Sequence, residues 1–505
     1  MAASSCSSFL IKILLCVSLL LYLNEKACVV HGADEITLPV SSLFPFPDCK
    51  ASTTNGPLSL SLSLSLSLSL SVASCMNSHG VSLKAQTRLS EANSTLKLVH
   101  KHGPCSPLFN GEPVNHTQLL LEDIVRAKWI RSKSSGTNTA NGLKDSAVSI
   151  KAKYGPGGGS YLVTVGLGTP KKDLTLLFDT GSALTWTQCE PCVVSCYSQD
   201  EAIFDPSQSS SYANISCSSP SCSQLGSGTC QPPRCSDSTC VYTAQYGDQE
   251  SFTVGFFATE TLTLSPTDAI SGFEFRCGQN NRGRFKRFAG LLGLARDRIS
   301  ILEQSATKYG RSFSYCLPPS TSSTGYLTFG KGSVVSTSVS FTPLSTVSQD
   351  AIFYGIDITG ISVGGKPLSI PLTVFSNAGT IIDSGTTITQ LPPTAYSALR
   401  SAFRQAMSKY KMSTPASPLD TCYDLSGSTV VTIPVITFSF RGPINVNLDP
   451  SGVLFPVNPS KVCLAFAASG DDTDLSIYGN TQQRSFEVVY DVAGGRIGFG
   501  AKGCS

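Results

Sequence analysis

The sequence predicts a mostly-β protein built from two similar halves that face each other across a cleft. Three observations lead to this fold class. From residue 160 onward, short strand-like runs are bounded by Gly, Pro, Asn and Asp. Only one segment there has clear helical periodicity, and one short motif around an aspartate occurs twice. A chain of 505 residues is long enough for two or three such units.

The strand and helix patterns are read from apolar spacing. Residues Tyr161, Val163, Val165 and Leu167 alternate with other side chains, as in a half-buried strand. After Pro392–Pro393, apolar residues recur at spacings of three and four, with basic residues between them that are expected to face water. The apolar set is Tyr396, Leu399, Phe403, Met407 and Tyr410, and the basic set is Arg400, Arg404 and Lys409. One amphipathic helix is therefore expected among many strands.

The repeated motif indicates the two halves. Leu176–Ser182 and Thr380–Thr386 are both apolar runs that end in Asp–(Ser/Thr)–Gly–(Ser/Thr). Each is followed downstream by an apolar segment containing glycine, Ala289–Leu294 and Ser476–Asn480. Each half thus presents one carboxylate, Asp179 or Asp383, and we expect the two to meet in the cleft.

The N-terminal 150 residues differ from the rest. Lys12 followed by the apolar run Ile13–Leu23 and the small pair Gly32–Ala33 predicts a signal peptide over residues 1–33, with a Ser-rich plastid transit peptide as the alternative. Residues 34–150 are polar and weakly patterned, and contain the basic interval Arg126–Lys133. The Leu/Ser alternation at 58–71 is typical of a slipped dinucleotide repeat in the gene. We expect it to be disordered or absent from the mature protein.

The charged residues and histidines exclude several function classes. From Lys151 onward there are 25 Lys and Arg against 25 Asp and Glu, which does not favour nucleic acid or an acidic membrane as a partner. All five histidines precede Lys151: His31, His79, His100, His102 and His116. Histidine-based nucleophilic catalysis and histidine-ligated metal sites are therefore excluded from the C-terminal body.

Nineteen cysteines fit an oxidising compartment. In a secreted chain they are expected as disulfides, although the spacing of Cys189, Cys192 and Cys196 is also compatible with zinc. Three sequons, at Asn93, Asn115 and Asn214, are candidate glycosylation sites.

The two aspartates carry the predicted chemistry. A strand that ends in Asp–x–Gly places its carboxylate on a tight loop, because glycine permits the turn and a close approach. The supporting residues are Thr180, Gly181, Ser182, Ser384, Gly385 and Thr386, whose hydroxyls can orient the carboxylates. Two carboxylates about 3 Å apart share one proton, so they can activate a water between them for attack on a peptide carbonyl. This chemistry requires no metal, cofactor or covalent intermediate. The alternative for either motif alone is a simple hairpin turn.

Phe178–Ser182 together with Ile381–Thr387 resembles the pepsin-type aspartic proteases, over roughly Ser160 to Ser505. The resemblance implies a bilobal fold with a central cleft and a few short helices. It also implies a flap over the cleft with Tyr246 and Gly247, and identifies Trp186 as the tryptophan whose indole N–H reaches the flap tyrosine. Both aromatic residues could otherwise be ordinary core residues.

More narrowly, the body resembles the plant nepenthesin-like branch, because eight cysteines fall between Cys189 and Cys240 in a disulfide-rich insertion. Leu96–Leu108 and Val488–Phe499 resemble a subgroup that includes a chloroplast-nucleoid DNA-binding protease and apoplastic relatives. This resemblance implies a propeptide over 34–150, an N-terminal lobe over 151–340, a C-terminal lobe over 341–505, and a disulfide between Cys422 and Cys463. The chain departs from the pattern in an extra cysteine, which we take to be Cys230, in Gln249 and Glu250 of the flap, and in the basic run Arg282–Arg287.

Three functions follow from these expectations. The first is a secreted, monomeric aspartic endopeptidase, made as a zymogen, that acts on polypeptide substrates and is inhibited by its own propeptide, without metal or membrane anchor. The second is a catalytically silent protein on the same scaffold that binds proteins or glycosidases. The third is a plastid protease that also binds DNA. The expected address is the apoplast or another extracellular space, with vacuole or chloroplast as alternatives.

Overall fold

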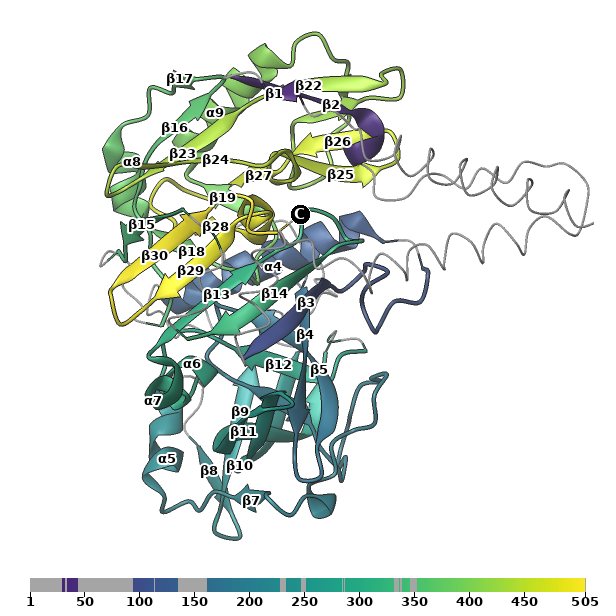
Figure 1. Cartoon of the computed structure of the whole chain (residues 1–505), viewed down its shortest axis with the longest axis vertical. Helices are drawn as coiled ribbons and strands as arrows, with labels where there is room; N and C mark the ends of the chain where they lie inside the picture. Colours follow the sequence, from purple (N-terminus) through teal and green to yellow (C-terminus); the bar gives the residue numbers. More distant parts are fainter. Residues whose placement is uncertain are drawn as a thin grey trace, which may run out of the picture.

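The computed structural model describes residues 30–31, 34–43, 94–134 except 113, 161–227, 233–246, 251–283, 285, 287–330, 336, 338–345 and 352–504. Two β-rich lobes lie at opposite ends of the long axis, and strands from both ends of the chain join them in the middle (Figure 1). The prediction of a mostly-β, bilobal fold is confirmed.

One large sheet extends from the middle of the molecule into the N-terminal lobe. Its strand order is β15-β30-β29-β13-β14-β3-β4-β5-β12-β6-β11-β10-β9-β8, and β7 pairs with β10. The strands are β3 Thr95–His100, β4 Tyr161–Leu167, β5 Lys172–Asp179, β6 Trp186–Gln188, β7 Ala213–Asn214, β8 Arg234–Ser236, β9 Thr239–Gln245, β10 Phe252–Ser265, β11 Asp268–Arg282, β12 Gly290–Gly293, β13 Ser312–Cys316, β14 Thr324–Phe329, β15 Val339–Pro343, β29 Glu487–Asp491 and β30 Arg496–Gly500.

The C-terminal lobe contains four smaller sheets. Their orders are β17-β16-β23-β24, β18-β28-β19-β27, β20-β21-β26-β25 and β1-β2-β22. The strands are β1 Val30–His31, β2 Glu35–Pro39, β16 Ile358–Val363, β17 Lys366–Pro367, β18 Thr380–Ile382, β19 Thr389–Leu391, β20 Met412–Ser413, β21 Cys422–Asp424, β22 Val430–Pro434, β23 Ile436–Phe440, β24 Ile444–Asn447, β25 Leu454–Asn458, β26 Lys461–Leu464, β27 Phe466–Ala468 and β28 Ser476–Tyr478.

Helices are few, as the composition predicts. The α-helices are α4 His116–Ser134, α5 Pro220–Ser223, α6 Ile301–Gln304, α7 Ala306–Tyr309, α8 Leu372–Ala378 and α9 Pro393–Ala406, and short 3-10 turns include Val40–Leu43. Helix α9 is the predicted amphipathic helix, and its side chains Tyr396, Leu399 and Phe403 are buried. Helix α4 was not predicted from the sequence. Within the described residues, no helix is both long and apolar enough to span a membrane.

The repeated motifs lie in matching substructures. In the first half, β12 runs parallel to β5 and antiparallel to β6. In the second half, β28 runs parallel to β18 and antiparallel to β19. The two apolar–glycine segments therefore lie beside the strands that end in the two aspartates, which confirms that the sequence repeat reflects a structural repeat.

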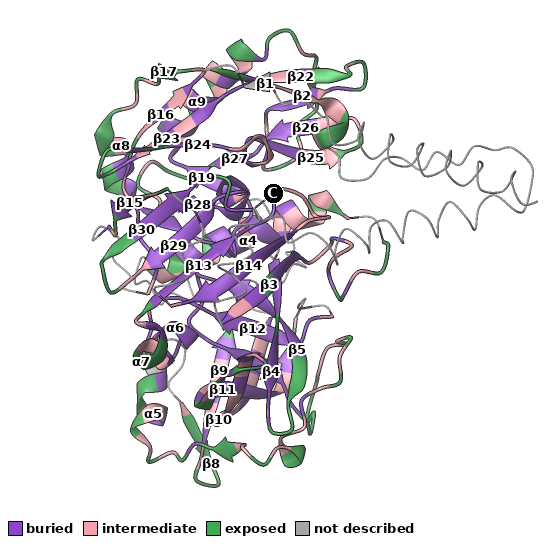
Figure 2. Ribbon diagram, viewed as in Figure 1, coloured by how far each residue is buried: buried purple, intermediate pink, exposed green. Residues whose placement is uncertain are grey.

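Two segments that precede the body pack into it. Strand β3 is inserted between β14 and β4 in the large sheet, where Leu98 pairs with both Gly325 and Val163. Helix α4 lies across the middle of the molecule (Figure 1). Figure 2 shows that β3, its neighbour β14 and the next strand, β13, are largely buried. Residues 94–134 are thus part of the packed structure; the Leu/Ser repeat at 58–71 lies outside the described residues.

Disulfides fix both lobes. The pairs are Cys189–Cys277, Cys192–Cys196, Cys217–Cys235, Cys222–Cys240, Cys316–Cys504 and Cys422–Cys463. The pair Cys422–Cys463 was predicted, and Cys189, Cys192 and Cys196 are in disulfides rather than in a zinc site. Cys230 lies outside the described residues.

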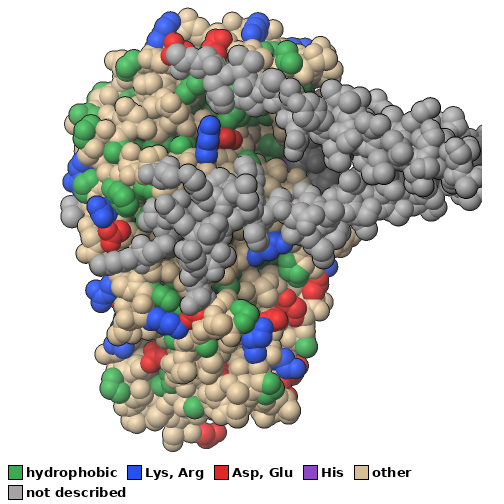
Figure 3. All heavy atoms as spheres, in the orientation of Figure 1, with side chains coloured by type: hydrophobic (Ala, Val, Ile, Leu, Met, Phe, Trp, Pro, Cys, Tyr) green, Lys and Arg blue, Asp and Glu red, His purple; other side chains and the backbone are tan. Residues whose placement is uncertain are grey.

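Among the described residues that are coloured in Figure 3, charges of both signs are scattered over the visible surface without a large patch of one sign. In the basic run that begins at Arg282, Arg287 pairs with Asp200 at 2.8 Å from Nε to Oδ1. That guanidinium is therefore engaged by a carboxylate of the same chain.

Candidate active site

Asp179 and Asp383 lie at the ends of β5 and β18, fully buried, in loops with matching hydrogen bonds. The backbone N–H of Gly181 donates to Asp179 Oδ1 at 2.9 Å, and that of Gly385 donates to Asp383 Oδ1 at 3.1 Å. The hydroxyl of Ser182 donates to Asp179 Oδ2 at 2.5 Å, and that of Thr386 donates to Asp383 Oδ2 at 2.6 Å. Each loop therefore donates a hydrogen bond to both oxygens of its own carboxylate.

The glycines of the two motifs are required by the close approach of the opposite loop. A Cβ built on Gly181 would lie 2.6 Å from Asp383 Oδ1, and one on Gly385 would lie 2.5 Å from Asp179 Oδ1. Separations below 3.0 Å are not tolerated by a real side chain. Only glycine at both positions allows each loop to reach the carboxylate of the other half.

Thr180 and Ser384 join the two loops to each other. The N–H of Thr180 donates to Ser384 Oγ at 3.0 Å, and the N–H of Ser384 donates to Thr180 Oγ1 at 2.9 Å. We expected all four flanking hydroxyls to orient carboxylates, and for these two residues the prediction was wrong. Their hydroxyls accept from backbone amides across the lobe interface, so they fix the distance between the loops rather than the rotation of a carboxylate.

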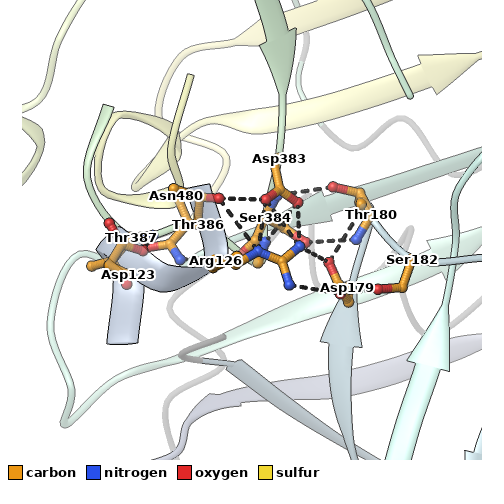
Figure 4. Close-up of polar contacts among 12 residues, drawn as sticks. Asp123, Arg126, Asp179, Thr180, Ser182, Asp383, Ser384, Thr386, Thr387 and Asn480 are labelled. Carbon is orange, nitrogen blue, oxygen red and sulfur yellow. Dashed lines mark hydrogen bonds and ion pairs between the residues drawn. The ribbon is translucent and has the colours of Figure 1, made fainter. Parts of the chain in front are cut away.

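Both carboxylates bind one guanidinium, that of Arg126 on α4 (Figure 4). Arg126 Nη2 lies 2.6 Å from Asp179 Oδ1 and 3.0 Å from Asp383 Oδ1, while Nη1 reaches Asp179 Oδ2 at 3.1 Å. Its Nε donates to Asp383 Oδ2 at 3.0 Å. The predicted juxtaposition of the two aspartates is thus present, with a cation of the N-terminal segment at the point expected for a water.

The rest of α4 is held mainly by the C-terminal lobe. The buried carboxylate of Asp123 accepts hydrogen bonds from the backbone N–H groups of Thr387 and Ile388 (Figure 4). Arg131 donates to the carbonyl of Leu475 at 3.0 Å and to the side-chain oxygen of Gln390 at 2.8 Å. Polar contacts on both sides of Arg126 therefore fix the helix over the carboxylates.

The electrostatics follow from burial. Burial raises the pKa of Asp383, an effect that the nearby charge of Asp179 strengthens and that of Arg126 opposes. Arg126 itself is 5% exposed, and its two carboxylate partners raise its pKa against the effect of burial. Two buried acids and one buried base form a compact group in which the guanidinium offsets the repulsion between the acids.

The flap residues lie close to this group. The ring centroids of Tyr246 and Trp186 are 6.5 Å apart, and Trp129 of α4 lies 6.3 Å from Tyr246. The resemblance implied that the indole N–H of Trp186 reaches Tyr246. The two buried groups lack a hydrogen bond of regular geometry, but burial raises the pKa of Tyr246 and the interaction with Trp186 opposes that increase, in line with the expected contact. Trp129 occupies the space beside the flap tyrosine. Gly247 lies outside the described residues, as do Gln249 and Glu250.

Two site residues, Arg126 and Asp123, were missed by sequence reasoning. Arg126 was noted only as the start of a basic interval. A cation three residues after Asp123, in a segment that precedes the first Asp–x–Gly motif, was the available signal. Its partners are 53 and 257 residues away, so local pattern alone could not identify them.

The other candidates have simpler outcomes. Asn115 and Asn214 are exposed, whereas Asn93 lies outside the described residues. In the part of the chain that the structure describes, no group of three or more His, Cys, Asp and Glu side chains could hold a metal ion.

Comparison with known proteins places this site in a family. Two family models match, one described as xylanase inhibitor N-terminal over residues 161–331 and one as xylanase inhibitor C-terminal over residues 353–501. An aspartyl protease family protein of Arabidopsis thaliana is 51% identical, over 86% of this chain and 92% of its own length. The chain belongs to the plant pepsin-like aspartic protease family.

Two further relatives support this family assignment. The aspartyl protease AED1 of Arabidopsis thaliana is 50% identical over 83% of this chain and 88% of its own length. The aspartic proteinase nepenthesin-2 of Nepenthes gracilis is 36% identical over 71% of this chain and 81% of its own length.

Solved structures share the fold of this family member. The crystal structure of basic 7S globulin from soybean aligns with a TM-score of 0.54 and 21% identity, over 67% of this chain and 91% of that chain. The crystal structure of edgp aligns with a TM-score of 0.55 and 23% identity, over 68% and 91%. At this identity the likeness concerns the fold alone.

Proposed function

We propose that this protein is an aspartic endopeptidase in which Asp179 and Asp383 are the catalytic pair. The observation that carries the proposal is that both carboxylates, from separate lobes and in matching loops, bind one guanidinium. Groups that share a single guanidinium can equally share a single water once that guanidinium leaves.

The chemistry then follows from the like charges. Without Arg126, two buried carboxylates this close cannot both be ionised, so they hold one proton between them. The ionised member takes a proton from the bound water as that water attacks the peptide carbonyl. The protonated member donates its proton to the carbonyl oxygen. The member that took the proton from water then passes it to the leaving amine, while the other carboxylate recovers a proton from a hydroxyl of the tetrahedral intermediate. The hydrogen bonds from Ser182 and Thr386 keep both groups oriented during this exchange.

We further propose that the chain is made as a zymogen, with residues 94–134 as its inhibitory segment. Arg126 forms ion pairs with both acids, and Trp129 fills space beside Tyr246. A substrate cannot reach the carboxylates while α4 is in place, so activation requires this helix to leave.

The test is turnover by the full-length protein after acidification, measured on denatured globin. Asp179→Asn and Asp383→Asn should each reduce the rate at least ~10³-fold while the protein stays folded, because each leaves a single carboxyl where the reaction uses two. Asp173→Asn, the same change at an exposed carboxylate of β5, is the matched control. Wild-type turnover in either Asn variant would refute the assignment.

A silent binding function is the second reading, because both matching family models carry the name of an inhibitor. The intact hydrogen bonds around both carboxylates favour catalysis. A properly acidified wild-type protein that binds glycosidases but leaves globin uncut would instead support the silent scaffold.

We also propose secretion to the extracellular space, with glycans on Asn115 and Asn214. The support is six disulfides among the described residues and the exposure of both asparagines. A fluorescent fusion found in plastids would contradict this address.

A further inference from the structure

Residues 34–43 form part of the C-terminal lobe, well separated from α4. Strand β2 pairs antiparallel with β22, from Glu35 opposite Pro434 to Pro39 opposite Val430. Figure 1 shows β2 at the top of the molecule and α4 at its centre. The N-terminal segment therefore contacts the body at a second place that is remote from the carboxylates.

Strand β22 depends on β2 for its backbone hydrogen bonds. Among the described residues, β22 has no other strand partner. Beyond the paired strands, the N–H of Val435 donates to the carbonyl of Asp34 at 2.9 Å, and the N–H of Val40 donates to the carbonyl of Thr429 at 2.9 Å. Removal of β2 would leave the backbone N–H and C=O groups along one edge of β22 without their hydrogen-bond partners.

The side chains of β2 complete the core of the lobe. Ile36 and Leu38 are each 4% exposed and belong to the same apolar cluster as Val431 and Ile433 of β22. Between them, Thr37 contacts Thr432 through their hydroxyls at 2.9 Å. The alternation of buried and outward residues is that of a half-buried strand, so β2 is fitted to this position by its sequence.

Nothing in these contacts depends on the inhibitory segment. Residues 44–93 separate β2 from β3, and in the described part of the chain β2 pairs only with β1 and β22. Departure of residues 94–134 from the cleft would therefore break no strand pairing of β2.

We propose that residues 34–43 are a permanent strand of the C-terminal lobe, which stays bound as a short separate chain when the peptide connecting it to the body is cut. The edge of β22 is thus a binding site whose occupant is this segment. The proposal rests on the proposed zymogen in one respect, namely that processing of the zymogen cuts the connecting peptide.

The test uses a cut that does not depend on the protein's own activity. In the full-length Asp179→Asn variant, residues 58–64 are replaced by the recognition sequence of a site-specific protease. After complete cleavage, the protein is passed through a gel-filtration column at micromolar concentration, and the peak is analysed by intact mass. We expect at least nine-tenths of the N-terminal fragment to elute with the body. A fragment that elutes alone overturns the proposal and leaves the proposed catalysis untouched.

Variants locate the contact. The double variant Ile36→Asp/Leu38→Asp should raise the fraction of free fragment at least tenfold, because two carboxylates would enter the apolar cluster. Ser41→Asp/Ser42→Asp, which adds the same two charges at exposed positions of the segment, should change nothing. Hydrogen exchange at Val430–Pro434 provides a second readout. Cutting should leave its protection unchanged in the parent protein, and equal protection in the double variant would also overturn the proposal.

Discussion

Among single residues, the main energetic cost at the site is the burial of two carboxylates. Asp179 and Asp383 are both fully buried, and each already has hydrogen bonds from its own loop. What those loops cannot supply is a compensating positive charge. Arg126 supplies it to both acids at once, with a planar group whose nitrogens match two carboxylates. Under the proposed function, the same contact that offsets the repulsion between the two acids would also keep the protein inactive.

Arg126→Ala should weaken the docking of α4 by ~3–5 kcal/mol, because it leaves two buried acids without their partner. We expect the full-length variant to cleave globin at a higher pH than the wild type does. Lys128→Ala, an exposed lysine on the same helix, should behave as wild type. Limited proteolysis within residues 116–134 measures undocking independently of activity, and equal protection of both variants would contradict the role of Arg126.

The two aspartates could be predicted from sequence because their motif is local and occurs twice. Gly181 and Gly385, Ser182 and Thr386 follow from the same short pattern. Arg126 could not be predicted, since nothing near it in sequence shows that its partners come from two distant strands. Thr180 and Ser384 were assigned the wrong task, because a hydroxyl that orients a carboxylate and one that bridges two loops look alike in sequence.

At the scale of elements, the same reasoning explains why α4 was missed and α9 was not. Helix α9 has one apolar face and one face exposed to solvent, so its helical periodicity can be recognised in the sequence. Helix α4 is covered on more than one side, and its buried residues include Glu122, Asp123 and Arg126 alongside Leu120 and Ile130. Because charged residues lie on its buried face, α4 has no continuous apolar stripe that would identify it as a helix in the sequence. The strand β2 was missed because five residues before a low-complexity region carry too short a pattern.

The strand pair β21 and β26 provides a prediction about stability. Cys422–Cys463 closes a loop of 41 residues between these strands, and both cysteines are fully buried. Replacing both by Ala should lower the free energy of unfolding by about 4 kcal/mol, from the chain entropy restored to the unfolded state. The matched pair Cys192–Cys196 spans only four residues, and its removal should cost about 2 kcal/mol. Denaturant unfolding of both variants measures the difference, and a larger loss for Cys192–Cys196 would contradict this account.

At the scale of the whole molecule, residues 94–134 connect the lobes through a strand and a helix that belong to neither repeat. Strand β3 completes the large sheet, and α4 fills the cleft. The histidines that the body lacks are concentrated here. Burial lowers the pKa of His100 well below 6.5, and the charges of His102, Arg484, Lys101 and His116 lower it further. Burial, with help from Arg484, also lowers the pKa of His116.

These shifts predict how docking depends on pH. A histidine whose pKa is lowered in the docked state favours docking above about 6.5, and this contribution is lost as pH falls toward the docked pKa. Asp123 acts in the opposite sense. Burial raises its pKa to about 7 against the hydrogen bonds from Thr387 and Ile388, so its contribution is present at low pH and lost as pH rises through 7. Each group changes docking by at most ~1.4 kcal/mol per pH unit, so over an interval in which both histidines titrate their combined effect exceeds that of Asp123.

Release of residues 94–134 should therefore occur on acidification, and His100→Gln should move its midpoint to lower pH by about 0.5–1 unit. Glutamine keeps an acceptor for the backbone N–H of His102, which donates to the His100 ring, but cannot become charged. The readout is the tryptophan fluorescence change as Trp129 leaves Tyr246, compared in an Asp179→Asn background so that no cleavage intervenes. Asp123→Asn should steepen the loss of docking in acid, because the opposing titration is gone. An unchanged midpoint in His100→Gln would show that the charge of this histidine does not drive release. A shift of the midpoint toward higher pH would mean that protonated His100 stabilises the docked segment, which is the reverse of what its burial requires.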